Sequence, residues 1–121
     1  MLKKFLVMML ATFSLYGCGD SKPEEILNAE VELWSSYKDS GIYKDLTCRT
    51  DNFDGDWVMY CRDKGGNVGG LYELKVLGKK GHHQILSLND TAVKDAEKMR
   101  RLYHFYEQST VDVDQAIRDL S

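Results

Sequence analysis

The chain has 121 residues and a formal net charge of −3, from 16 Lys and Arg against 19 Asp and Glu. This length suits one small domain, and the lack of a basic excess argues against a nucleic-acid-binding protein. The sequence contains no G-x-S-x-G, H-E-x-x-H, Walker or dinucleotide-binding motif, which leaves the common enzyme templates without support.

Residues 1–17 have the pattern of an export signal. Lys3 and Lys4 form a basic start, and an apolar run from Phe5 to Leu15 follows that is too short to cross a bilayer. The run ends in Leu15-Tyr16-Gly17-Cys18, which resembles the lipobox of bacterial prolipoproteins. The alternatives are an ordinary secretory signal and an uncleaved anchor helix.

The lipobox resemblance implies that the Cys18 sulfur receives a diacylglycerol and that cleavage leaves Cys18 as the new N-terminus. It also implies the outer membrane, periplasmic face, because Gly19 stands where an Asp would favour inner-membrane retention. We therefore expect a signal peptide over residues 1–17, a lipidated tether over 18–22 and one domain over 23–121. Without residues 1–17 the chain has 14 basic and 19 acidic residues, a net charge of about −5.

The first predicted element is a helix from about Pro23 to Lys38. Ser21 and Glu24 have capping-box spacing, and Gly41 follows as a stop signal. Its apolar positions form one wide arc: Ile26, Leu27, Ala29, Val31, Leu33, Trp34 and Tyr37. Glu30 falls inside this arc, where a carboxylate is either paired or perturbed.

A β-hairpin is predicted from residues 44–50 and 56–62, because Asp54-Gly55 suits a two-residue type I′ turn. In that register the numbers of opposing residues sum to 109, so Cys48 faces Cys61 in a close, non-hydrogen-bonded pair. If Cys18 is lipidated, these two cysteines remain to form a disulfide in an oxidising compartment. The alternative is two buried free thiols.

The remaining pattern completes an α+β domain with helices packed on a four-stranded antiparallel meander. A glycine-rich loop (64–70) precedes a strand over 71–77, in which Tyr72, Leu74 and Val76 alternate with Glu73 and Lys75. The later elements are a strand over 84–88, a helix over about 91–107 and a tail over 111–120 with helical spacing.

The predicted helix over 91–107 has a basic face opposite its apolar stripe, formed by Lys94, Lys98, Arg101 and Phe105. Cations around an exposed aromatic ring suit contact with a protein partner or with anionic lipid headgroups. In the alternative, the tail (Val113, Ile117 and Leu120) covers Phe105 and leaves a solvated charged face.

Neither a cofactor nor a metal site is expected. The Asp51–Asp56 stretch fits a turn better than a calcium loop, because Thr50 and Cys61 occupy key ligand positions. His82 and His83 point to opposite faces if they lie on a strand, and we expect solvated loop histidines. Glu30 is a lone carboxylate without a second catalytic group.

The sequence thus favours a non-enzymatic binding or adaptor module for another envelope component, without a small-molecule substrate. The second hypothesis is an inhibitor, immunity or exclusion factor against an envelope-targeting hydrolase, toxin, phage or plasmid. Such a protein would present a protruding loop, for which residues 64–70 are the candidate.

Overall fold

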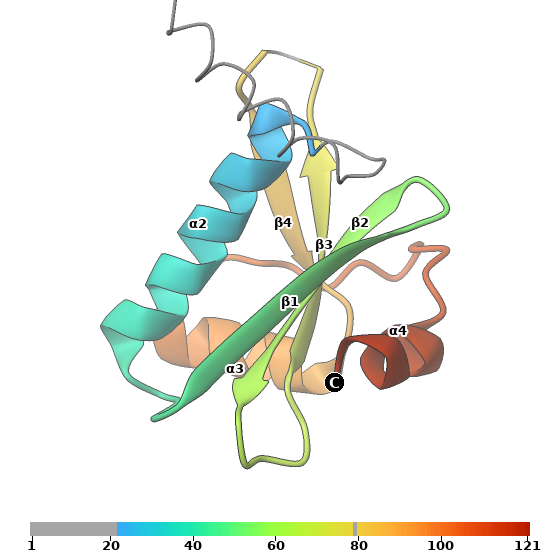
Figure 1. Cartoon of the computed structure of the whole chain (residues 1–121). Coiled ribbons are helices and arrows are strands. Elements are labelled where there is room, and N and C mark those ends of the chain that lie inside the picture. Colours follow the sequence, from blue (N-terminus) through green and yellow to red (C-terminus); the bar gives the residue numbers. More distant parts are fainter. Residues whose placement is uncertain (1–21, 79) are drawn as a thin grey trace, which may run out of the picture.

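The computed structural model describes residues 22–78 and 80–121. The predicted signal peptide, Cys18 and the tether before Lys22 lie outside the described residues. The described part contains α2 (Glu24–Ser40), β1 (Leu46–Phe53), β2 (Asp56–Asp63), β3 (Gly70–Val76), β4 (His83–Ser87), α3 (Asp90–Met99) and α4 (Val113–Leu120). Figure 1 shows one twisted sheet with α2 and α3 beside it and α4 near the C-terminus. None of the described helices is both long and apolar enough to cross a membrane.

Helix α2 follows the predicted limits closely. It begins after Pro23 and ends at Ser40, where Gly41 adopts a left-handed conformation (φ 68°) and donates its N–H to the Tyr37 carbonyl. A glycine suits this position because a side chain would be strained there. The buried side of α2, including Ile26, Leu33 and Tyr37, packs into the main core.

The predicted hairpin and its register are confirmed. Asp54 and Gly55 both have positive φ, at 55° and 97°, as a type I′ turn requires. The strands pair antiparallel in the order β1-β2-β3-β4, and Cys48 lies opposite Cys61. The two cysteines form a disulfide, so the predicted staple between adjacent strands is present.

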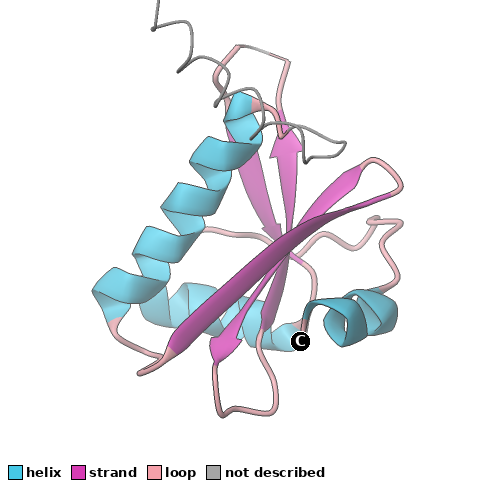
Figure 2. Ribbon diagram, viewed as in Figure 1, coloured by secondary structure: helices cyan, strands magenta, loops and turns pink. Residues whose placement is uncertain are grey.

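Helices cover both faces of the sheet (Figure 2). On one face α2 and α3 pack over Met59, Tyr72 and Ile85. On the other face α4 packs over Val58 and Tyr60 through Ala116 and Leu120. Strand β2 therefore has buried side chains on both sides, as its apolar sequence predicts.

The predicted helix over 91–107 is wrong beyond Met99. Arg100 adopts a left-handed conformation (φ 61°), and its N–H bonds to the carbonyls of Ala96 and Glu97, which closes α3. The following segment runs beside β4, where Phe105 forms a parallel bridge with Ser87. This path buries Tyr103, which is 8 % exposed, against the main core.

The position of Glu73 differs from the alternating pattern predicted for its strand. Glu73, on the polar side of the predicted strand, is 3 % exposed, and its Oε1 accepts a 2.6 Å bond from the Ser109 hydroxyl. The polypeptide after Tyr106 therefore lies over that face of β3.

The tail forms helix α4, which packs on the sheet, and Phe105 remains 52 % exposed. The alternative in which the tail covers Phe105 is therefore wrong.

Candidate functional site

The four residues of the predicted basic face occupy two different segments. Lys94 and Lys98 are exposed on α3, one helical turn apart, whereas Arg101 and Phe105 lie beyond the end of the helix. Arg101 and Phe105 still come together, because both line a shallow pocket of about 230 Å³ beside Leu102. The structure therefore replaces a helical face with a patch that spans the end of α3.

We call this surface the 98–105 patch: Arg101, Leu102 and Phe105 line the pocket together with Glu97. The exposed Lys98 and Arg100, which are their neighbours in the sequence, complete the definition. Leu102 is 82 % exposed, the highest value among the exposed large hydrophobic side chains of the described residues. Sequence reasoning missed both Arg100 and Leu102, because a continued helix was expected. The double arginine at 100–101, next to an apolar residue, was the available signal.

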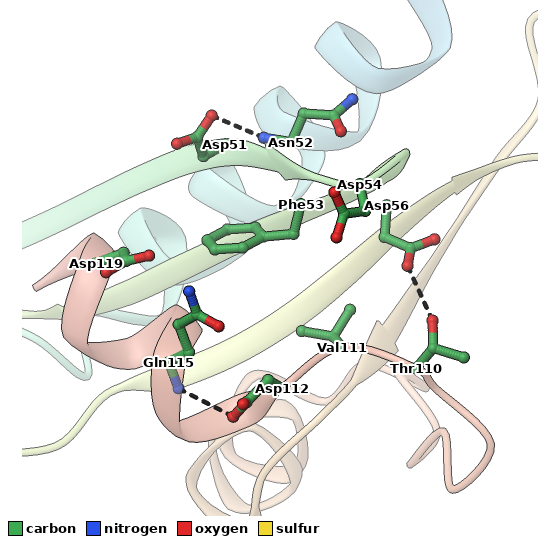
Figure 3. Close-up of a pocket in the computed structure, with 10 residues that line it drawn as sticks. All are labelled: Asp51, Asn52, Phe53, Asp54, Asp56, Thr110, Val111, Asp112, Gln115 and Asp119. Carbon is green, nitrogen blue, oxygen red and sulfur yellow. Dashed lines mark hydrogen bonds between the residues drawn. The ribbon is translucent and has the colours of Figure 1, made fainter.

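A second open site is an acidic pocket of about 530 Å³ between the β1–β2 hairpin and α4 (Figure 3). Asp51, Asp54 and Asp56 come from the hairpin, and Asp112 and Asp119 come from the α4 region, more than fifty residues later in the chain. Phe53 lies among them. The lining contains five carboxylates and no cation, so the pocket carries a negative potential.

Several of these acidic groups already have local partners. Asp56 Oδ2 accepts a bond of 3.1 Å from the Thr110 hydroxyl, and Asp112 Oδ1 accepts one of 3.2 Å from the Gln115 N–H. Within residues 22–78 and 80–121, no three His, Cys, Asp or Glu side chains are placed to hold a metal ion. The Asp54-Gly55 segment forms the predicted turn.

A third surface is a largely apolar groove of about 550 Å³ between α2 and β1, lined by Val31, Trp34 and Met59 among others. Glu30, the carboxylate inside the predicted apolar arc, lies in this groove and pairs with Lys22 at 2.8 Å. Of the two alternatives for Glu30, pairing is therefore the one observed.

The core contains a hydrogen-bonded group of tyrosines around Asp95. Asp95, which is 3 % exposed, accepts bonds from Tyr37 at 2.7 Å and Tyr43 at 2.6 Å. The Tyr37 hydroxyl lies 2.7 Å from that of Tyr72. A Cβ at Gly70 would lie 2.5 Å from the Tyr37 hydroxyl oxygen, so this close packing depends on glycine there. Sequence reasoning missed the group, because its members come from α2, the loop after it, β3 and α3.

Burial, followed by the neighbouring Tyr72 and Asp95, raises the pKa of Tyr37 well above its usual value near 10. Burial likewise raises the pKa of Tyr72. Tyrosine in the unfolded chain loses its proton near pH 10, whereas these folded side chains keep their protons to higher pH. Their contribution to stability is therefore complete below pH 10 and decreases as the pH rises above it.

We predict that the free energy of unfolding decreases steeply above pH 10. Urea unfolding at pH 8, 10 and 11 measures this dependence. Tyr72→Phe removes one of the groups that must ionise, so its loss of stability between pH 10 and 11 should be smaller than that of the unmodified protein. Equal pH dependence of the two proteins would contradict the prediction.

The expectation of solvated loop histidines is wrong for His83 and fits His82, which is exposed. His83 Nε2 lies 2.7 Å from Glu32 Oε1, and the other Glu32 oxygen accepts a 2.9 Å bond from Tyr103. Burial raises the pKa of Tyr103 to about 12. The hydrogen bond to Ser36 opposes this increase, and the neighbouring Glu32 adds to it. These bonds join α2 to β4 and to the segment after α3.

In comparisons with known proteins, no family model, curated protein or solved structure matches this chain.

Proposed function

We propose that this protein is a lipid-anchored envelope protein whose domain binds another envelope protein without catalysing a reaction. The anchor is Cys18, and the location is the periplasmic face of the outer membrane. The lipobox-like Leu15–Cys18 supports the anchor, and the disulfide between Cys48 and Cys61 fits an oxidising compartment.

The single observation that carries the binding proposal is the 98–105 patch. Leu102 and Phe105 are 82 % and 52 % exposed, which leaves apolar area open to water beside Arg101, with which they line one pocket. Exposed apolar side chains with flanking charges are typical of protein contact sites. The cations favour an acidic surface on the partner, because complementary charge speeds encounter and selects the partner.

The arrangement of the polar groups supports a non-catalytic role. The tyrosines with raised pKa bond to Asp95, to Glu32 or, in the case of Tyr72, to Tyr37. They therefore connect secondary-structure elements, and their hydroxyls are occupied by structural bonds.

We predict that Leu102→Ser with Arg101→Glu abolishes partner capture in the native envelope. The assay places a photoreactive residue at exposed position 104 of the full-length, lipidated chain and identifies the cross-linked protein. The expected result is an adduct with one envelope protein, reduced about tenfold or more by the double variant, because the apolar contact and the favourable charge are both lost.

The matched control is Val76→Ser with Lys44→Glu, which removes an exposed apolar side chain and reverses a charge elsewhere. This control should leave the adduct unchanged. Adducts with phospholipid alone would contradict a protein partner, and equal loss in both double variants would contradict the patch. Cys18→Ala tests the anchor separately, since it should release the chain from the membrane.

The second candidate function, an inhibitor or exclusion factor, is favoured by the loop between β2 and β3. Figure 1 shows this loop extending beyond the end of the sheet, and Val68 in it is 56 % exposed. Protruding apolar loops suit insertion into a concave partner site. The same cross-linking assay separates the two functions. Loss of the partner adduct in Val68→Asp, together with its retention in the Leu102→Ser, Arg101→Glu double variant, would favour the inhibitor or exclusion function.

A further inference from the structure

Strand β1 forms an open edge of the sheet. It has eight residues, contains no proline, and pairs only with β2 among the residues that the structure describes. The other edge is partly covered, because Ser87 of β4 bonds to the backbone of His104 and Tyr106 at 2.8 and 2.9 Å. A long, regular and unpaired edge presents N–H and C=O groups that another strand can bond.

The hairpin register determines which groups are open. Because Phe53 and Asp56 close the two-residue turn as a hydrogen-bonded pair, Arg49 and Asp51 also bond to β2, and the alternate residues do not. The peptide groups of Cys48 and Thr50 therefore point away from β2, as does that of Asn52, whose N–H bonds to Asp51 Oδ1 at 2.8 Å. An added strand must bond to these residues, and it places side chains on both faces of the sheet.

We propose that β1 pairs with β1 of a second copy of this chain, antiparallel and centred on Thr50, to form a continuous eight-stranded sheet. In this register the numbers of opposing residues sum to 100. Thr50 faces Thr50 of the second copy at the two-fold axis, and Arg49 faces Asp51 of the second copy twice. Directly opposite residues of opposite charge stabilise neighbouring strands.

The open peptide groups also allow β1 to pair with the second copy in other registers, but the charges of Arg49 and Asp51 disfavour them. Pairing centred on Cys48 would place Asp51 opposite Asp45 of the second copy, and both groups are acidic. Pairing centred on Asn52 would place Asp51 opposite Phe53 and leave Arg49 beyond the strand. Only the Thr50 register pairs both charges of β1 with opposite charges.

The surroundings of β1 fit a second copy on both faces. Arg49 is exposed and donates a 3.2 Å bond to the Ser121 carbonyl, and Asp51 lines the acidic pocket together with Asp119. Arg49 of the second copy would bring a cation to the edge of that pocket. On the opposite face, the groove beside Cys48 and Thr50 has about 550 Å³ of open space for the added side chains.

The symmetry also fits the proposed anchor. A two-fold axis between antiparallel edge strands is perpendicular to the sheet, so both α2 helices remain on the same face. Lys22, which precedes α2, lines the groove on that face. Lys22 of both copies therefore lies on one side of the sheet, as two anchors in the same membrane require. This step alone rests on the proposed lipid anchor.

The test is a charge swap in the full-length chain in its own membrane. A photoreactive residue at Thr50 should give an adduct of twice the chain mass. Arg49→Asp and Asp51→Arg each place like charges opposite one another at two sites, and each should reduce the adduct about tenfold or more. The combined variant R49D/D51R restores opposite charges and should restore the adduct.

Lys94→Asp reverses a charge away from β1 and is the control. It should leave the yield of the dimeric adduct unchanged. Absence of the dimeric adduct, an adduct with a different protein, or failure of the double swap to restore it would overturn the proposal. The β1 variants should leave the cross-link from position 104 unchanged. Loss of one cross-link without the other therefore shows which of the two proposals has failed.

Discussion

Asp95→Ala is expected to lower the free energy of unfolding by about 2–5 kcal/mol, because each buried hydroxyl left without its acceptor costs about 1–3 kcal/mol. Two hydroxyls lose this acceptor, that of the buried Tyr37 and that of the partly buried Tyr43, which bond Asp95 at 2.7 and 2.6 Å. The Tyr37 hydroxyl also contacts that of Tyr72, so the loss reaches β3. For a domain whose total stability is about 5–15 kcal/mol, this is a large fraction.

Urea unfolding followed by tryptophan fluorescence measures this effect. Asp95→Asn should be less destabilising, since both hydroxyls bond to the same carboxylate oxygen, Oδ2, and an amide oxygen in its place still accepts hydrogen bonds. Glu97→Ala is the matched control, because Glu97 is an exposed carboxylate on the same helix. A loss below 1 kcal/mol for Asp95→Ala, or equal losses for both helix positions, would show that Asp95 does not hold the tyrosines together.

Removal of the disulfide is the second large effect. Cys48→Ala with Cys61→Ala should lower the free energy of unfolding by about 3 kcal/mol, because the bond closes a short loop and limits the unfolded chain. The bonded residues are 13 apart in sequence. The hairpin register should survive, since the Asp54-Gly55 turn and the cross-strand pairs are retained.

Equilibrium unfolding with and without a thiol reductant provides the measurement. The reductant should reduce the stability of the unmodified protein by a similar amount and leave the double alanine variant unaffected. No change on reduction, or two titratable thiols in the oxidised, unfolded domain, would contradict a stabilising bridge between these strands.

The elements predicted correctly are those whose signals are local. The Asp54-Gly55 turn determines the register of β1 and β2, and this register alone brings Cys48 to Cys61. Helix α2 has a proline before its first residue and Gly41 after its last. Each of these features depends on the conformation of a few adjacent residues, so tertiary contacts did not alter them.

The 98–105 patch was only partly predictable. Apolar residues continue at helical spacing from Met99 to Tyr103 and Tyr106, so the pattern alone favours a longer α3. In the structure the chain leaves the helix at Arg100, and Tyr103 reaches Ser36 and Glu32 while its carbonyl accepts a bond from Ser87. These partners belong to α2 and β4, far away in sequence, and they outweigh the intrinsic helical preference.

Local signals along the chain suffice for the α+β class, the meander order, the hairpin register and the disulfide, because neighbouring residues set backbone conformation and side-chain alternation. Four other features became visible only in the packed fold: the end of α3, the tyrosine group around Asp95, the acidic pocket beside α4 and the open edge of β1. These features depend on which distant segments pack together, and periodicity along one segment carries no record of its partners.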